Sequence, residues 1–88
     1  MPYSFEIKPE LAVKLRKIKK KNFLLFQRIQ KRIGEIIENP THYKPLRYDM
    51  KNIRRVHLDP FVLIFSVNEN EGLVEFLDLD HHDKIYKR

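Results

Sequence analysis

Residues 53–67, IRRVHLDPFVLIFSV, decide the fold. Apolar and basic side chains alternate along residues 53–58, which is the pattern of a β-strand with one buried face. Asp59-Pro60 is a turn signal, and residues 61–67 are apolar on both faces, as a central strand must be. Because this connection is too short for a crossover, we expect the two strands to be antiparallel.

Two more strands are predicted on either side of this unit. Residues 73–79 follow a polar hairpin loop that ends with Gly72, and they are apolar enough to form the last strand of a meander. At the other end of the chain, residues 3–7 alternate between apolar and polar side chains and predict an N-terminal strand. Residues 41–52 are polar and contain no periodic pattern, so we expect a loop there.

Two helices are predicted between the first strand and this loop. Residues 9–20 and 23–37 carry apolar side chains at spacings of three and four, and the second helix should stop at Asn39-Pro40. We therefore expect one α+β domain, residues 1–88, in which an N-terminal strand and an α-helical hairpin pack on a small antiparallel β-sheet. The side chains expected to be mostly buried are Leu11, Leu15, Ile18, Phe26, Ile33, Ile37, Val56, Leu63 and Phe65.

Composition limits the function classes. Residues 1–55 have a net charge of +10 and residues 56–88 one of −4, so the N-terminal part should attract an anion. The chain has no cysteine and two glycines, which argues against disulfides, thiolate zinc sites and glycine-rich phosphate loops. It has neither a long apolar span nor a signal-peptide pattern, so we expect a cytoplasmic protein without membrane contact or cofactor.

Three polar segments, residues 44–51, 54–57 and 80–86, could meet on the sheet face that the helices leave open. They hold three of the four histidines, and histidine can act as a general acid or base near neutral pH. A metal site within residues 80–83 is disfavoured, because neighbouring residues on a strand point to opposite faces. The candidate RNA-binding residues are Lys44, Arg47, Lys51, Arg54 and His81.

Structural alternatives remain for these charges. The basic helix faces can simply be solvated surface, and the Arg54-Arg55 pair can form ion pairs with Glu75 or Asp78. Guanidinium groups also match phosphate oxygens, so anion binding is the competing interpretation for the same two arginines.

In the order of its motifs, the whole chain resembles the RelE/ParE superfamily of toxins. The resemblance rests on the opening strand, the basic helical hairpin ending at Asn39-Pro40, and the segments 44–47, 55–65 and 82–86. Residues 55–65, RVHLDPFVLIF, are similar to an Arg-Val-Arg-Val-Gly-Asp-Tyr-Arg-Val-Ile-Tyr motif, with His57 at the second arginine and Val62 at the last. The histidines resemble the pattern of the YafQ branch.

This resemblance implies a ribosome-dependent endoribonuclease that cleaves mRNA, inhibits translation and is held inactive by a RelB-like antitoxin. The catalytic residues that it implies are His57, His82, Arg55 and Tyr86. Such RNA cleavage needs a base, an acid and cations, but no metal. We expect His57, among basic residues, to be the base and His82, beside Asp80 and Asp83, to be the acid.

Two other functions remain open at this point. The ParE branch of the superfamily is similar in fold but poisons DNA gyrase, and it lacks the catalytic set. The basic helices would also suffice for an RNA-binding module without catalysis. Arg55, His57 and His82 on the open face favour the ribonuclease.

Overall fold

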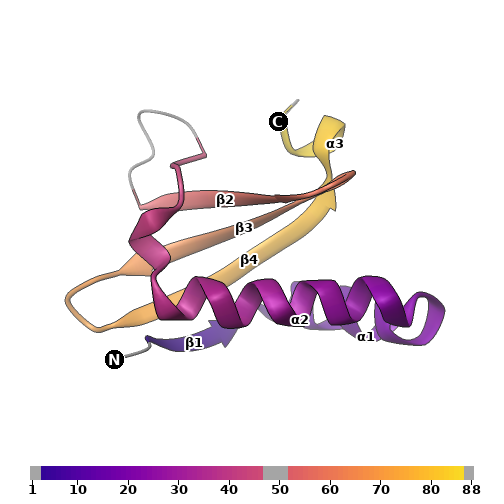
Figure 1. The fold of residues 1–88 in the computed structure, drawn as a ribbon, viewed down its shortest axis with the longest axis horizontal. Helices are drawn as coiled ribbons and strands as arrows, with labels where there is room; N and C mark the ends of the chain where they lie inside the picture. Colours follow the sequence, from indigo (N-terminus) through magenta and orange to yellow (C-terminus); the bar gives the residue numbers. More distant parts are fainter. Residues whose placement is uncertain (1–2, 47–51, 87–88) are drawn as a thin grey trace.

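The computed structural model describes residues 3–46 and 52–86, and the backbone alone for Tyr86. Two helices lie on one side of a twisted sheet, and a short C-terminal helix lies at one end of it (Figure 1). The elements are β1 (Ser4–Ile7), α1 (Pro9–Lys21), α2 (Phe23–Glu38), a 3₁₀ turn η1 (Pro40–His42), β2 (Ile53–Leu58), β3 (Phe61–Asn68), β4 (Leu73–His81) and α3 (His82–Tyr86).

The sheet has the order β1-β4-β3-β2, and it is mixed. The three meander strands β2, β3 and β4 are antiparallel as predicted, and Gly72 takes a positive φ of 63° in the loop before β4. The predicted fold class is confirmed, and the N-terminal strand β1, for which no direction was predicted, pairs in parallel with β4, with Ser4 opposite Leu73. Only short connections force strands to be antiparallel, and the whole helical hairpin and two strands separate β1 from β4.

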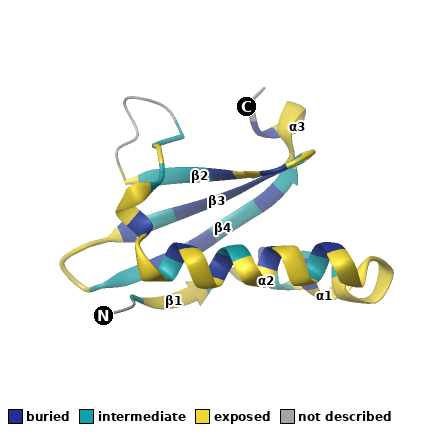
Figure 2. Ribbon diagram, viewed as in Figure 1, coloured by how far each residue is buried: buried dark blue, intermediate teal, exposed yellow. Residues whose placement is uncertain are grey.

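The helices bury one sheet face. Dark-blue buried positions recur on the sides of α1 and α2 that face the sheet (Figure 2). The core prediction is confirmed: six of its nine side chains are buried, and Ile18, Phe26 and Ile37 are partly buried against the same cluster. Phe65 and Phe76 lie fully buried at its centre, with ring centroids 5.9 Å apart.

The turn between the helices is fixed by a cap. Asn22 Oδ1 accepts a hydrogen bond of 3.1 Å from the Leu25 backbone N–H, which satisfies one donor at the start of α2. Pro9 occupies the first turn of α1, where its missing N–H costs nothing. Among the described residues, no helix is long and apolar enough to cross a membrane.

The second sheet face carries a smaller apolar cluster. Val62 and Ile64 of β3 pack there with Ile85, and Ile85 belongs to α3. The last strand, predicted over residues 73–79, extends to His81, and the chain turns into a helix at His82. Two contacts explain this turn: the His82 N–H donates to the Pro60 carbonyl at 3.0 Å, and Ile85 covers the apolar side chains of β3.

Candidate active site

Strand β2 divides its side chains between the two faces of the sheet. Val56 and Leu58 are buried under the helices, so Arg55 and His57 project from the opposite face, as the alternation predicts. Arg55 Nη1 lies 3.5 Å from His57 Nδ1. Because a guanidinium can only donate, Arg55 is the donor and His57 Nδ1 the acceptor in this contact.

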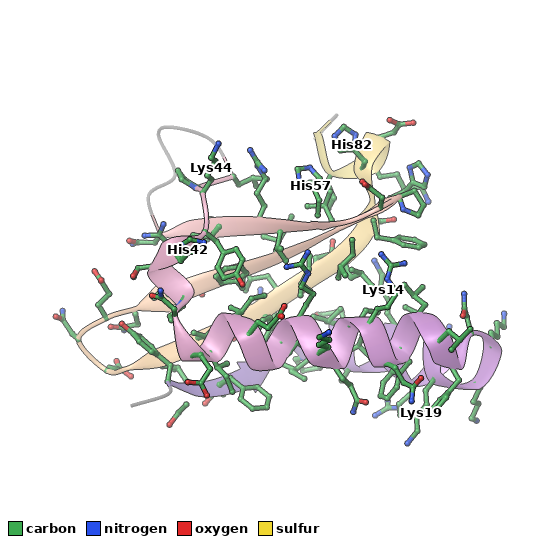
Figure 3. All side chains as sticks on the ribbon, viewed as in Figure 1. Lys14, Lys19, His42, Lys44, His57 and His82 are labelled. Carbon is green, nitrogen blue, oxygen red and sulfur yellow. The ribbon has the colours of Figure 1, made fainter. Side chains whose placement is uncertain are left out.

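Helix α3 brings a second imidazole to His57. The rings of His57 and His82 are 5.7 Å apart between centroids and inclined by 29°, and they lie side by side at one end of the sheet (Figure 3). Asp83 Oδ1 lies 3.7 Å from His82 Nδ1, where it can pair with an imidazolium. The His81 ring lies instead against the Phe61 ring, with 6.2 Å between the ring centroids and 74° between the ring planes. The helical turn at His82 thus decides which histidine meets His57.

The segment after η1 runs along the outer edge of β2. The Leu46 N–H donates to the Ile53 carbonyl at 2.8 Å, and the Arg55 N–H donates to the Lys44 carbonyl at 3.1 Å. Lys44 therefore lies beside Arg55, and a hollow of about 260 Å³ opens between this segment and His57.

His42 and Tyr43 also line this hollow, with Lys44, Arg55, Val56 and His57. Sequence reasoning missed both, because residues 41–52 show no periodic pattern. The available signal was His42 and Lys44, two residues apart in the polar segment that precedes the basic strand.

Arg54 does not join this group. Its Nη1 donates to the Tyr43 carbonyl at 2.6 Å on the helix-covered side of β2, and the Tyr43 ring lies against Phe65 at 5.9 Å. Arg54 thus ties the η1 segment to the core. Among the described residues, the buried side-chain nitrogens without a hydrogen-bond partner are Nε of Arg54 and Nε of Arg55.

The other candidates cannot all be placed. Arg47 and Lys51 lie outside the described residues, and for Tyr86 the structure describes the backbone at the end of α3 but not the side chain. Within the described parts of the chain, no three His, Asp or Glu side chains converge on a common point as metal ligands would.

Lys14 of α1 joins the helical layer to the end of β4. Strand β1 covers β4 only as far as Phe76, and beyond it Lys14 Nζ donates to Asp78 Oδ1 at 2.9 Å and to the Leu79 carbonyl at 3.0 Å. Lys14 Nζ also lies 3.5 Å from Asp80 Oδ2. This lysine therefore holds the strand that leads directly into His82.

These contacts affect the pKa of Asp80. Partial burial raises the pKa of Asp80, but the hydrogen bond from the His81 backbone N–H and the charges of Lys14 and Lys84 outweigh burial and leave this pKa below its ordinary value. The Asp80 side chain is 21% exposed. The charged carboxylate is therefore the form that the fold stabilises.

Replacing Lys14 by Met should lower the free energy of unfolding near pH 7 by about 1 kcal/mol, the upper range for a partly exposed ion pair. A carboxylate whose folded-state pKa is lowered adds stability above its unfolded-state pKa and loses it as the pH falls through the folded-state value. The stability difference between the wild type and Lys14→Met should therefore shrink toward pH 3, as urea unfolding curves would show.

Lys20→Met is the matched control, since Lys20 is an exposed lysine in the last turn of the same helix. It should change the stability much less at either pH. Equal losses for the two variants, or a Lys14→Met loss of the same size at pH 7 and pH 3, would contradict the role given to Lys14.

Known proteins match this chain over nearly its whole length. Residues 5–86 match the model of the family described as ParE toxin of the type II toxin-antitoxin system parDE. A protein of Methanocaldococcus jannaschii named "Putative toxin RelE4" is 46% identical over 87 residues, which cover 98% of this chain and 93% of that protein.

Solved structures show the same fold. A free mutant of the E. coli toxin RelE matches with a TM-score of 0.79 and 16% identity over 99% of this chain and 93% of that chain. A chain of the toxin-antitoxin complex RelBE2 from Mycobacterium tuberculosis matches with a TM-score of 0.72 and 19% identity. The match covers 93% of this chain and 100% of that chain. The chain described here thus belongs to the RelE/ParE family and is a toxin of a type II toxin-antitoxin system.

Proposed function

We propose that this toxin is a ribosome-dependent endoribonuclease that cleaves mRNA by acid–base catalysis with its own side chains. The observation that carries the proposal is the stacked pair of imidazoles, His57 and His82, beside the Arg55 guanidinium. A toxin that acts only by binding would not need two imidazoles at this distance. The proposal places the protein in the cytoplasm, with mRNA and the ribosome.

The chemistry needs one proton removed and one supplied. His57 takes the proton of the RNA 2′-hydroxyl, whose oxygen attacks the adjacent phosphorus, and the bond from phosphorus to the 5′-oxygen breaks. His82 gives a proton to that leaving oxygen. The products are a 2′,3′-cyclic phosphate and a 5′-hydroxyl end, so the reaction consumes no water in this step and balances without an added reagent.

Arg55 is suited to stabilise the charge that develops on the phosphate. The contact of its Nη1 with His57 is exposed, so this end of the guanidinium is accessible to a ligand. A phosphate oxygen in the adjoining hollow would accept a hydrogen bond from this exposed end, and Lys44 lines the same hollow. This assigns Arg55 as the oxyanion clamp and Lys44 as an additional phosphate contact.

The open shape of the site supports dependence on the ribosome. The hollow beside His57 holds about 260 Å³, and apart from the buried Val56 it is lined by exposed and half-buried side chains, so it does not enclose a nucleotide by itself. Rate acceleration requires the reacting groups to be held in line. The ribosome would hold the mRNA in the required geometry, as the family resemblance implies.

A cognate RelB-like antitoxin is the proposed protein partner. The solved relative from M. tuberculosis is a toxin-antitoxin complex. The present chain has the positive charge that an acidic antitoxin segment would complement, with a formal net charge of +6.

Expression of this chain alone should arrest growth, and co-expression with the antitoxin from the neighbouring gene should restore it. Mapping of RNA ends should show breaks within translated mRNA that carry 5′-hydroxyl groups, and purified toxin should cut the same mRNA only when ribosomes are present. Cleavage of free mRNA at the same rate would contradict ribosome dependence, and growth arrest with intact mRNA would contradict the ribonuclease.

The match to the ParE model favours a second candidate, the gyrase-poisoning activity that the resemblance implies for that branch. The same experiment separates the two. A gyrase poison would inhibit supercoiling of plasmid DNA by purified gyrase and leave mRNA intact.

A further inference from the structure

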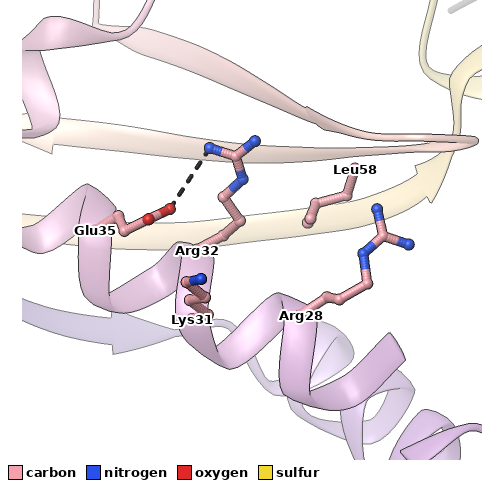
Figure 4. A pocket seen from close by; sticks show the side chains of 5 residues that line it. All are labelled: Arg28, Lys31, Arg32, Glu35 and Leu58. Carbon is pink, nitrogen blue, oxygen red and sulfur yellow. Dashed lines mark ion pairs between the residues drawn. The ribbon is translucent and has the colours of Figure 1, made fainter. Parts of the chain in front are cut away.

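A basic groove lies on the helix-covered side of β2, away from the histidine pair. It has a volume of about 340 Å³ and is lined by Arg28, Lys31, Arg32 and Glu35 of α2 and by Leu58 at the end of β2. Arg28 and Arg32 extend from α2 toward β2, and Leu58 lies between them (Figure 4). None of these residues belongs to the site proposed above.

The chemistry of the groove suits a phosphodiester. Arg28 and Arg32 are one helical turn apart and therefore share a face of α2. Glu35 Oε1 lies 3.5 Å from Arg32 Nη1 and offsets one positive charge, so the groove keeps a net charge of +2. Guanidinium groups bind phosphate oxygens through two parallel hydrogen bonds, whereas lysine offers a point charge.

The lysine-rich helix α1 is less suited to this role, although it holds more positive charges. Lys14 is engaged with Asp78 and Asp80. Lys19 Nζ lies 5.5 Å from the centre of the Phe26 ring, in a cation–π contact within the hairpin. Two cations of α1 thus serve the fold, while the arginines of α2 stand together at a groove.

The position of the groove connects it to the histidine pair. His57 and Leu58 are adjacent on β2, so the imidazole and the groove lie on opposite faces of one strand. β2 is an edge strand, and the segment 44–46 covers its outer edge at Ile53–Arg55. The edge beyond Arg55 is where a flexible chain could pass from one face to the other.

We propose that this groove is a second phosphate-binding site, which holds the backbone of single-stranded RNA as it passes round the edge of β2 from the histidine pair. This inference rests on the ribonuclease proposal for the choice of RNA. An acidic protein segment fits the groove less well, because helical partners need several apolar anchors and the groove offers only Leu58.

The test is a salt titration of RNA binding. The probe is a fluorescently labelled, unstructured 2′-O-methyl RNA of about 12 nucleotides, which cannot be cleaved, and anisotropy is recorded between about 50 and 200 mM salt. A plot of log K against log salt has a negative slope. In the double variant Arg28→Gln/Arg32→Gln, the magnitude of this slope should decrease by about 1.4, since each lost single-strand phosphate contact removes about 0.7.

The matched control is Lys20→Gln/Lys21→Gln, which removes the same two charges from the exposed end of α1 and should keep the wild-type slope. Arg28→Lys/Arg32→Lys keeps both charges and tests the guanidinium geometry: it should preserve the slope and weaken binding severalfold. This conservative variant also guards against a folding defect in the glutamine variant, which circular dichroism would reveal.

An unchanged slope in Arg28→Gln/Arg32→Gln, or an equal drop in the lysine control, would overturn the proposal. So would a variant that binds RNA normally but no longer binds the antitoxin, since the groove would then serve an acidic protein. Binding is measured without cleavage. A chain that fails to cut mRNA but shows the expected slopes would refute the ribonuclease proposal and support the groove as an RNA-binding site.

Discussion

His57→Ala and His82→Ala should each lower the single-turnover rate of ribosome-dependent mRNA cleavage by about 100-fold or more, the usual contribution of one positioned proton-transfer group. The first variant loses the base for the 2′-hydroxyl, and the second loses the acid for the 5′-oxygen. Both side chains are exposed, so both proteins should fold and still bind ribosomes. Quenched-flow cleavage and ribosome co-sedimentation would separate these effects.

His81→Ala is the natural control for this pair. His81 precedes His82 in the chain, but its ring lies against Phe61 rather than against His57. Its replacement should leave the cleavage rate within a few-fold of the wild type. If the His81 variant were damaged and the His82 variant were not, the assignment of the acid would move to His81. If neither change mattered, histidine catalysis would be rejected in favour of a toxin that acts by binding.

Arg55→Ala should lower the cleavage rate by about 100- to 1000-fold, as expected when a donor to a developing oxyanion is removed. Arg55→Lys should recover only part of this loss, because an ammonium group cannot reproduce the two parallel hydrogen bonds of a guanidinium. Substrate binding should weaken less than the rate. A full recovery by lysine would mean that Arg55 acts through its charge alone.

Arg54 offers a matched comparison on the same strand. Because Arg54 donates to the Tyr43 carbonyl on the helix-covered side, Arg54→Ala should reduce the free energy of unfolding by about 2 kcal/mol, the loss of a charged hydrogen bond. Arg55→Ala should reduce it far less. Urea unfolding of both variants alongside the cleavage assay would test this division, and a reversal of the two effects would contradict the assignment of faces to β2.

The strands and helices follow from local patterns in the sequence. The alternation in residues 53–58 and the three-and-four spacing in the helices each identify a buried face, and both faces are buried as expected. The direction of β1 was not predictable in this way, because its partner β4 is far away in the chain and no short turn joins them. Its parallel pairing is a property of the assembled sheet.

The candidate site was predictable in its residue types and less so in its geometry. The alternation of β2 places Arg55 and His57 on one face, and the structure agrees. Which of His81 and His82 joins them depends on where β4 ends, and that is decided by the contact of Ile85 with β3 and the His82–Pro60 hydrogen bond. Such contacts join residues far apart in sequence, so they leave no periodic signal.

The parallel pairing of β1 with β4 also determines when the sheet can form during protein synthesis. During synthesis β1 is made before the other described strands, but its partner, Leu73–Phe76, is made only after both long helices and two further strands. Contacts between distant parts of a chain cannot form until both parts exist. The sheet that carries His57 therefore closes only after β4 has been made, and the helix with His82 follows directly after it. A ribosome that makes this toxin must therefore complete every element from β1 to α3 before the two histidines can meet.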